Sequence, residues 1–162
     1  MRIVVFSDSH GNYYALEDAV EANLSADMFI HLGDGQRELQ RLEEKYPDKK
    51  FIHVRGNCDF ASQSSLTEII VIDEKNKILA VHGHNHGVRS GSVSLLKSLA
   101  MMNNANIVLF GHTHCRYQHY EDGIYFLNPG SISEPRDGKP ASYGYIDIMP
   151  NGIMTNIVDL KK

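Results

Sequence analysis

The chain has 162 residues and a mass of 18.2 kDa, the size of one ordinary domain with one hydrophobic core. Hydrophobic residues make up 42% and charged residues 22%, close to globular averages, which excludes a disordered chain and a disulfide-rich scaffold. The net charge of −4 leaves no surplus of Lys and Arg, so neither nucleic acid nor a membrane surface is indicated as a partner. Nine histidines against two cysteines and no tryptophan are the unusual feature.

The two cysteines and the N-terminal segment bear on the compartment. Cys58 and Cys115 each sit beside a polar, histidine-rich stretch, and they form neither a C-x-x-C motif nor a disulfide framework. The apolar run at residues 2–6 is too short for a signal peptide, and no run of about 18 apolar residues appears. We therefore expect a soluble, cytoplasmic protein.

The first half predicts strands alternating with helices. Residues 2–6 form an apolar, β-branched run typical of a strand buried on both faces. A helix follows Asn12, a suitable N-cap, with an apolar face at Ala15, Leu16, Ala19, Val20 and Leu24. Next come a strand at 28–32, a helix at 36–46 and a strand at 51–54. Such alternation implies βαβ units and a parallel sheet.

The second half predicts hairpins around one further helix. Strands at 68–72 and 78–82 flank a polar turn, and a helix at 93–102 precedes a strand at 107–110. Two more hairpins are expected, at 117–121 with 124–127 and at 143–148 with 153–160. No repeat or linker interrupts the pattern. We expect a single α/β domain over residues 1–162, built from two packed sheets with helices outside.

Every unusual polar cluster follows a predicted strand. The clusters are Asp8-Ser9-His10-Gly11, Gly33-Asp34-Gly35, Gly56-Asn57-Cys58-Asp59, His82-Gly83-His84 and Gly111-His112-Thr113-His114. Ligands of open α/β sheets bind beyond the carboxyl ends of the strands, so these five loops can converge on one site. Asp, His and Asn donors suit divalent Mn, Fe, Ni, Co or Zn better than Ca or a thiolate-bound structural zinc. We expect the neighbouring glycines to let the backbone turn sharply beside the metals.

Each loop also has a simpler interpretation. Asp8 with His10 is commonly a capped helix start, Asn57 after a glycine is a common turn residue, and His112 with His114 could be a surface pair. Turn propensity does not demand histidine, so five such clusters together favour a shared site. Packing in the core or at the surface is the better interpretation of the histidines inside predicted strands or hairpins, His31, His53 and His119.

The ordered motifs D-x-H, G-D, G-N-x-D, H and G-H-x-H resemble the calcineurin-like metallophosphoesterase superfamily. More narrowly, G-N-C-D at 56–59, H-G-H at 82–84, G-H-T-H at 111–114, N-P-G-S at 128–131 and A-S-Y-G at 141–144 resemble the small bacterial and archaeal YfcE-type phosphodiesterases. The resemblance covers nearly the whole chain. It implies two mixed β-sheets packed face to face, with helices on both outer faces of a four-layer sandwich.

The resemblance also implies a site. One metal ion would be held by Asp8, His10 and His114, a second by Asn57, His82 and His112, and Asp34 would bridge the two. The implied cofactors are two divalent ions, manganese first, with nickel, iron, cobalt or zinc as alternatives. The implied reaction is hydrolysis of a small-molecule phosphoester, most often a phosphodiester, by in-line attack of a bridging hydroxide. Small relatives often form dimers or tetramers, so a homodimer or homotetramer remains open.

One position departs from the wider superfamily. Many members have a histidine after the asparagine of G-N-x-D, where it contacts phosphate and assists the leaving group, but this chain has Cys58. A thiol with a pKa of about 8.5 is a poorer proton donor than imidazolium. Asn57, Cys58 and His84 are therefore the candidates for catalytic roles, with water as a further proton donor.

Several residues are expected to support the site. Asp59 would orient a neighbouring ligand or Cys58, or would merely cap a turn. Asn128 would lie in a type II turn formed by residues 128–131 close to the site. The candidates for contacting phosphate are Arg37, Arg55, Arg89 and Arg116, and the sequence does not choose among them.

Two other functions use the same residues. A scaffold or binding module, like the eukaryotic retromer subunit of this superfamily, would carry a degraded metal site, whereas all seven ligand positions are present here. A metal sensor or store would saturate its ions with ligands, whereas seven ligands leave two ions with open positions for water and substrate. Both comparisons favour catalysis.

Overall fold

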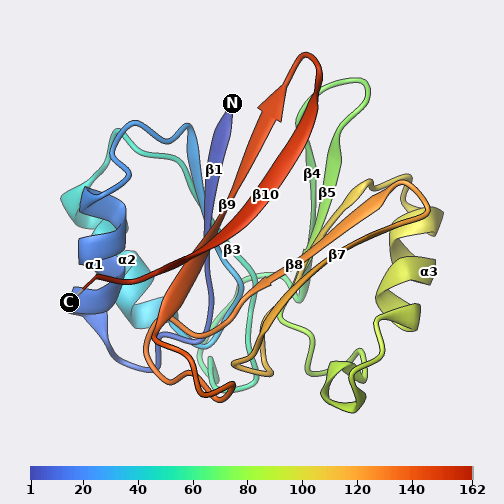
Figure 1. The fold of residues 1–162 in the computed structure, drawn as a ribbon. Coiled ribbons are helices and arrows are strands. Elements are labelled where there is room, and N and C mark those ends of the chain that lie inside the picture. The colour runs from blue at the N-terminus through green and yellow to red at the C-terminus, as the bar shows by residue number, and fades with distance from the viewer. Residues whose placement is uncertain (162) are drawn as a thin grey trace.

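The computed structural model describes residues 1–161, which form two five-stranded sheets and three α-helices (Figure 1). The first sheet has the order β10-β9-β1-β2-β3. Strands β1, β2 and the edge strand β3 run parallel, and β9 and β10 are antiparallel to their neighbours. The bounds are β1 (Arg2–Phe6), β2 (Met28–His31), β3 (Phe51–His53), β9 (Ser142–Met149) and β10 (Gly152–Asp159).

The second sheet has the order β4-β5-β6-β8-β7. Here β5, β6 and β8 run parallel, and the edge strands β4 and β7 pair antiparallel. The bounds are β4 (Thr67–Val71), β5 (Lys77–Val81), β6 (Ile107–Leu109), β7 (Arg116–Glu121) and β8 (Ile124–Pro129). Both sheets are mixed, as the resemblance implied, whereas the strand–helix alternation alone predicted only a parallel sheet for the first half; the C-terminal hairpin of β9 and β10 adds the antiparallel strands to that sheet.

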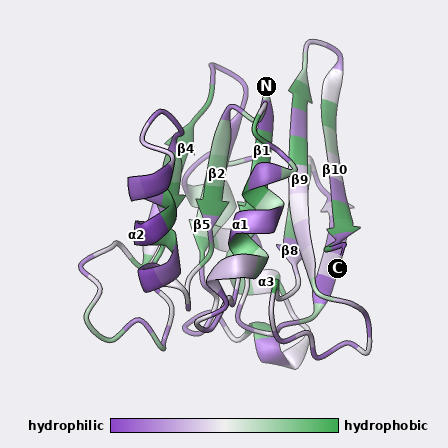
Figure 2. Ribbon diagram, turned by 90° about the vertical axis from the view of Figure 1, so that its left-hand side faces the viewer, coloured by the Kyte–Doolittle hydropathy of each residue, from purple (hydrophilic) through white to green (hydrophobic). Residues whose placement is uncertain are grey.

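The core consists of three apolar layers that separate four layers of secondary structure. The central layer takes side chains such as Val5 and Ile30 from one sheet and Ala80 and Leu109 from the other. The helices α1 (Tyr13–Glu21) and α2 (Gln36–Lys45) cover the outer face of the first sheet. Figure 2 shows α1 in front of β1 and α2 to its left, with hydrophilic stretches of both helices on the side that faces the viewer. Helix α3 (Ser94–Met102) covers the second sheet, which confirms the four-layer prediction.

Helix α1 is shorter than its apolar pattern predicted. It ends at Glu21, and Leu24 is 44% exposed, so the prediction that Leu24 belongs to the buried face is wrong. The side chain of Asn23 donates a hydrogen bond to the carbonyl of Ala19 at 2.8 Å, and its own N–H bonds to Val20. These bonds satisfy carbonyls in the last turn and turn the chain away before Leu24.

The segment expected as a turn at residues 128–131 is partly strand. Strand β8 continues through Pro129, which pairs with Arg116 of β7, and the chain turns only at Gly130 with φ +79°. Pro129 lacks an N–H, and it is tolerated because it is the last residue of its strand. The other predicted elements exist at their predicted places, with ends that differ by one or two residues.

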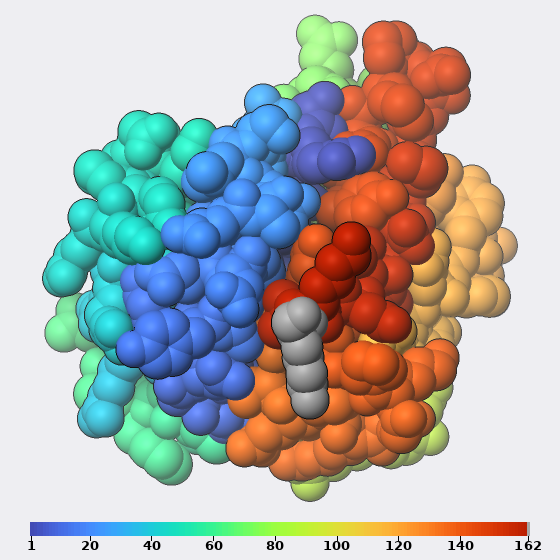
Figure 3. All heavy atoms as spheres, turned by 60° about the vertical axis from the view of Figure 1, so that its left-hand side comes forward, coloured from blue at the N-terminus to red at the C-terminus, as the bar shows by residue number. Residues whose placement is uncertain are grey.

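The first and last strands of the chain belong to one sheet, although the two termini lie apart (Figure 1). Strand β1 pairs with β9, and β9 pairs with β10, so the N-terminal and C-terminal segments belong to the same sheet. Figure 3 shows the N-terminal segment in blue beside the C-terminal segment in red. The carboxyl ends of β1, β2, β3, β5 and β6 all point to the lower edge in Figure 1, where the predicted site loops lie.

Candidate metal centre

Four of the seven predicted ligands form one group. The Nε2 of His114 lies 3.3 Å from the Oδ1 of Asp8 and 3.1 Å from the Nε2 of His10. The same nitrogen of His10 lies 3.8 Å from the Oδ2 of Asp34. Loops after β1, β2 and β6 supply these side chains.

The other three predicted ligands form a second group around His82. Its Nε2 lies 3.1 Å from the Oδ1 of Asn57, 3.2 Å from the Nδ1 of His112 and 3.5 Å from the Oδ2 of Asp34. One carboxylate oxygen of Asp34 therefore lies between the two groups, within 3.8 Å of His10 and 3.5 Å of His82. The structure brings all seven predicted side chains together.

The donor atoms fit bound cations. Asp8 is fully buried, and its Oδ1 has no hydrogen-bond partner within residues 1–161. The Nδ1 atoms of His82 and His114 lie 2.7 Å from the carbonyls of Leu32 and Glu134. A carbonyl can only accept, so each Nδ1 carries the proton and each Nε2 presents a lone pair to the site. Facing lone pairs and an unpartnered carboxylate oxygen match divalent cations of borderline hardness.

The ligand loops hold an unusual backbone conformation. Positive φ angles between 44° and 68° occur at five of the seven predicted ligands, namely Asp8, His10, Asp34, His112 and His114. Each left-handed residue with a side chain costs on the order of 1 kcal/mol, which the surrounding contacts must offset. The strands are thus packed firmly enough to hold the ligands in strained turns.

The glycines beside the ligands let neighbouring loops pack closely together as well as letting the backbone turn. Gly11, Gly33 and Gly83 have positive φ angles, as expected for glycines that let the backbone turn sharply, whereas Gly56 and Gly111 do not. A Cβ on Gly56 would collide with the carboxylate of Asp34, and one on Gly111 would collide with the hydroxyl of Ser7. At these two positions, only glycine lets the loops pack against the ligand carboxylates.

The electrostatic environment keeps the ligands in metal-binding protonation states. Burial would raise the pKa of Asp8, but the neighbouring His114 and His82 and the hydroxyl of Ser7 hold it below its ordinary value. Burial, together with the charges of His82 and Arg89, lowers the pKa of His112 to about 4. At neutral pH, the carboxylate of Asp8 is therefore charged and the ring of His112 is neutral.

Three hydrogen bonds that the sequence did not reveal fix Asp8. The hydroxyl of Ser7 donates to its Oδ2 at 2.5 Å, and the backbone N–H of His112 donates to the same oxygen at 3.1 Å. The hydroxyl of Ser131 donates to the carbonyl of Asp8 at 2.7 Å. The only signal in the sequence was the presence of hydroxyl residues within the motifs. Oδ1 is left as the free oxygen that faces the site.

A second supporting network lies under His10. The hydroxyl of Ser9 lies 3.1 Å from the Nε2 of buried His31 and donates to the Oε1 of Glu38 at 2.9 Å. The same Oε1 accepts the N–H of Gly11 at 2.6 Å. Glu38 on α2 thereby holds the loop on both sides of His10. His31 is a core residue, as expected for a histidine inside a strand.

Asp59 and Asn128 support neighbouring loops. Asp59 accepts four backbone N–H groups, those of Asp34, Gly35, Gln36 and Gly56, at 2.8 to 3.1 Å. The amide of buried Asn128 donates to the carbonyl of Gly111 and to Thr113, both at 3.0 Å. Asp59 therefore joins the loop after β2, which carries Asp34, to its own loop after β3. Asn128 holds the loop that carries His112 and His114.

The candidates for catalytic and phosphate-binding roles occupy different places. The backbone N–H of Cys58 donates to Asp34 at 2.7 Å, and its sulfur lies within 4.8 Å of ligand atoms of His10 and Asp34. The ring of His84 lies one layer further out, with its centroid 5.4 Å from that of His82. Arg116 is bound to Asp159 at 2.6 Å, which removes it from the candidates for phosphate. Arg37 lines a pocket next to the ligands.

Comparison with known proteins agrees with this geometry. The family model of the calcineurin-like phosphoesterase superfamily domain matches residues 1–151. The chain belongs to this superfamily. It is similar to the phosphodiesterase YfcE of Escherichia coli K12, with 32% identity over 91% of this chain and 88% of that protein. It is equally similar to the probable metallophosphoesterase YsnB of Bacillus subtilis, with 31% identity over 91% and 85%.

Solved structures of the superfamily share the fold. A phosphoesterase-like protein of Streptococcus pneumoniae superposes with a TM-score of 0.78 at 27% identity, over 97% of both chains. Vps29 of Chaetomium thermophilum, at 15% identity, shares the fold alone, with a TM-score of 0.77 over 98% of this chain and 95% of that one. Membership of this superfamily makes the chain a phosphoester hydrolase that depends on divalent metal ions, and the Asp and His cluster is the candidate site for them.

No helix within residues 1–161 is long and apolar enough to cross a membrane.

Proposed function

We propose that this phosphoesterase hydrolyses phosphodiesters with two divalent metal ions, manganese first. Asp8, His10 and His114 would hold one ion, Asn57, His82 and His112 the other, and Asp34 would bridge them. The observation that carries the proposal is the Oδ2 of Asp34, which faces His10 at 3.8 Å and His82 at 3.5 Å. Two such ions supply an acidified water as nucleophile and positive charge for the phosphoryl oxygens.

The chain's own side chains would orient the metal ligands, support their loops and supply a proton to the leaving group. The lone pairs of His82 and His114 are directed by the carbonyls behind them, so these rings need not reorganise when ions bind. Asp59 and Glu38 hold the ligand loops in their strained conformations. The neutral thiol of Cys58 lies at the edge of the site and would donate a proton to the departing alkoxide, with His84 or water as alternatives.

Cys58 has the protonation state that a donor needs. Burial of the sulfur, the hydrogen bond to Asp34 and the nearby carboxylates raise the pKa of the thiol to about 11 in the metal-free protein. In the metal-free protein the thiol is therefore protonated at neutral pH, and its raised pKa makes it a weaker acid than an ordinary thiol.

A catalytically weak scaffold is the second candidate, because Vps29 proteins have the same fold. Against it, none of the seven predicted ligands is replaced, and all seven side chains point into one site. A scaffold has no need for five ligands in a strained backbone conformation. The complete and strained ligand set supports an enzyme.

The test is hydrolysis of bis(p-nitrophenyl) phosphate by protein stripped of metal and reloaded with manganese, nickel, cobalt or zinc. We expect turnover with at least one metal and its loss in excess chelator. A panel of phosphodiesters and phosphomonoesters then distinguishes the two ester classes, with faster turnover of diesters expected. Loaded protein that hydrolyses none of these esters would favour the scaffold.

A further inference from the structure

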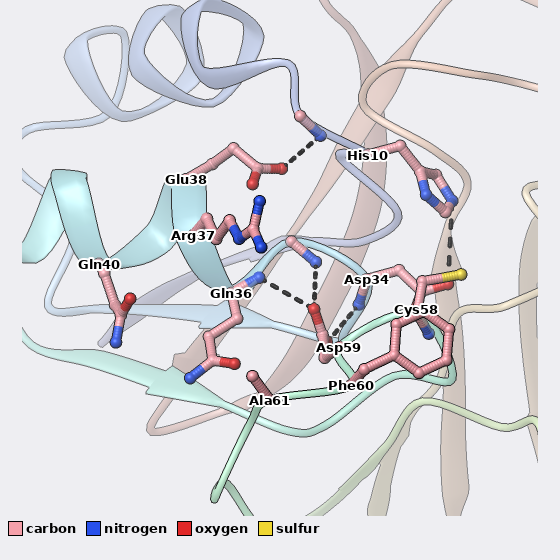
Figure 4. A pocket seen from close by; sticks show the side chains of 12 residues that line it. His10, Asp34, Gln36, Arg37, Glu38, Gln40, Cys58, Asp59, Phe60 and Ala61 are labelled. Carbon is pink, nitrogen blue, oxygen red and sulfur yellow. Dashed lines mark hydrogen bonds and ion pairs between the residues drawn. The ribbon is translucent and has the colours of Figure 1, made fainter.

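A pocket of about 620 Å³ opens directly beside the candidate metal centre (Figure 4). It shares His10, Asp34 and Cys58 with the site and extends from there to helix α2. A phosphodiester has two ester groups, and a phosphorus at the metal centre would place one of them in this pocket. The side chains of the pocket therefore bear on which esters the enzyme accepts.

One wall of the pocket is an exposed aromatic ring. Phe60 lines the pocket and is 93% exposed, more than any other large hydrophobic residue of the described chain. It follows Asp59, whose carboxylate is fixed by four backbone N–H groups, so the backbone that carries the ring is held firmly. No aromatic ring within residues 1–161 stacks on it. Phe60 thus offers a free aromatic face beside the site.

The opposite wall consists of polar side chains from the start of α2. Gln36 and Gln40 are four residues apart on one face of the helix, and Arg37 stands beside them (Figure 4). Each amide offers both donors and acceptors, as the edge of a nucleobase does. The N–H groups of Gly35 and Gln36 at the helix start are bound to Asp59, which leaves the guanidinium of Arg37 as the source of positive charge.

An aromatic face opposite hydrogen-bonding amides suits a flat, polar ring system. Aromatic side chains stack on any nucleobase, and this contact contributes roughly 1–3 kcal/mol per base. A short alkyl ester would leave both walls without a partner. Resting on the proposed function, we propose that this pocket binds the nucleoside of a nucleotide phosphodiester, with the base on Phe60 and Gln36 and Gln40 at its edge.

The test compares two esters with the same leaving group. Thymidine 5′-(p-nitrophenyl) phosphate and methyl p-nitrophenyl phosphate differ only in the retained group. In manganese-loaded wild-type protein, we expect a higher kcat/KM for the thymidine ester. In Phe60→Ala, the ratio of the two kcat/KM values should fall about tenfold, the loss of one stacked base. Tyr14→Ala, which removes a 72% exposed ring from α1 outside this pocket, should keep the wild-type ratio.

Binding gives a readout that does not depend on turnover. Calorimetric titration with thymidine 5′-monophosphate should show a dissociation constant about tenfold weaker in Phe60→Ala than in wild type. An unchanged ratio and unchanged binding in Phe60→Ala, with activity present, would overturn the pocket assignment alone. Nucleotide binding that depends on Phe60 in protein inert towards both esters would overturn the proposed function and keep the pocket.

A subunit contact is the competing role for an exposed ring. Sedimentation of wild type and Phe60→Ala should give the same mass. A loss of mass in the variant would place Phe60 in an interface between copies of the chain and overturn the nucleoside assignment.

Discussion

The carboxylate of Asp59 accepts the backbone N–H of Asp34 at 2.8 Å. Asp59 lies in the loop after β3, and it thereby holds Asp34, the ligand between the two groups, in the loop after β2. The same oxygen of Asp59 accepts the N–H of Gly56 at 2.9 Å. One side chain therefore fixes the separation of the two loops. The hydrogen bond from the N–H of Asp34 to Asp59 also helps to offset the steric cost of the φ angle of 59° at Asp34.

Asp59→Asn should destabilise the protein by about 2 kcal/mol at pH 7, because hydrogen bonds to a charged group become neutral ones. Urea unfolding measures the change. The ring of His53, whose Nε2 lies 3.6 Å from the carboxylate, and the hydrogen bonds from backbone N–H groups hold the pKa of Asp59 well below its ordinary value despite burial. Its stabilisation is thus present above about pH 4 and lost as the pH falls further. Asp18→Asn, at an exposed position of α1, is the control. An equal loss of stability in both variants would contradict the role of Asp59 in holding the two loops.

His31 should make the metal-free protein sensitive to mild acid. Complete burial lowers the pKa of His31 to about 3. Below about pH 6.5, the unfolded chain takes up a proton that folded His31 does not, so stability falls by about 2 kcal/mol between pH 7 and pH 5. In His31→Gln, this part of the pH dependence should disappear from unfolding curves recorded in chelator. His119→Gln at the exposed hairpin should retain it, and a wild-type slope in His31→Gln would refute the assignment.

Removal of one predicted ligand should abolish activity and leave the fold intact. His112→Ala and Asn57→Ala should each lower kcat/KM on bis(p-nitrophenyl) phosphate by roughly 100-fold or more, the scale of losing preorganised charge stabilisation. Elemental analysis should find less bound metal, and circular dichroism should match wild type, because both side chains lie at the rim and not in the core. His119→Ala is the matched control. Near-full activity of either ligand variant after reloading would contradict the ligand assignment.

Cys58→Ala should matter most for poor leaving groups. An alkoxide needs a proton as it departs, whereas p-nitrophenolate does not, so the variant should lose roughly tenfold or more on alkyl diesters and much less on nitrophenyl esters. The measurement is kcat/KM for a series of diesters with different leaving groups. Cys115→Ala, a change at the other thiol, should leave the series as in wild type. Parallel losses across the series would exclude Cys58 as the proton donor.

The sequence predicted the fold because each of its signals is local. Apolar β-branched runs such as residues 2–6 mark buried strands, and the residues that follow them lie by necessity at the carboxyl edges of the sheets. The placement of Asp8 and His82 could therefore be predicted from their positions after strands. The end of α1 could not, since the bond from Asn23 to Ala19 competes with the apolar spacing that includes Leu24.

The parts of the site that escaped prediction depend on contacts between distant segments. Glu38 approaches Gly11 across 27 positions, and Ser131 approaches Asp8 across 123, and neither residue type is unusual in its own segment. Phe60 had no signal either, because an aromatic residue in a loop is normally expected to be buried. Its exposure is visible only once the surrounding loops are in place.

The central claim is that Asp34 joins two ion sites at which phosphodiesters are hydrolysed. Manganese content and hydrolysis of bis(p-nitrophenyl) phosphate, measured on the same samples of wild type and Asp34→Ala, test it most directly. We expect two ions per chain with turnover in wild type, and fewer than two without turnover in the variant. Two tightly bound ions with wild-type turnover in Asp34→Ala would contradict the account.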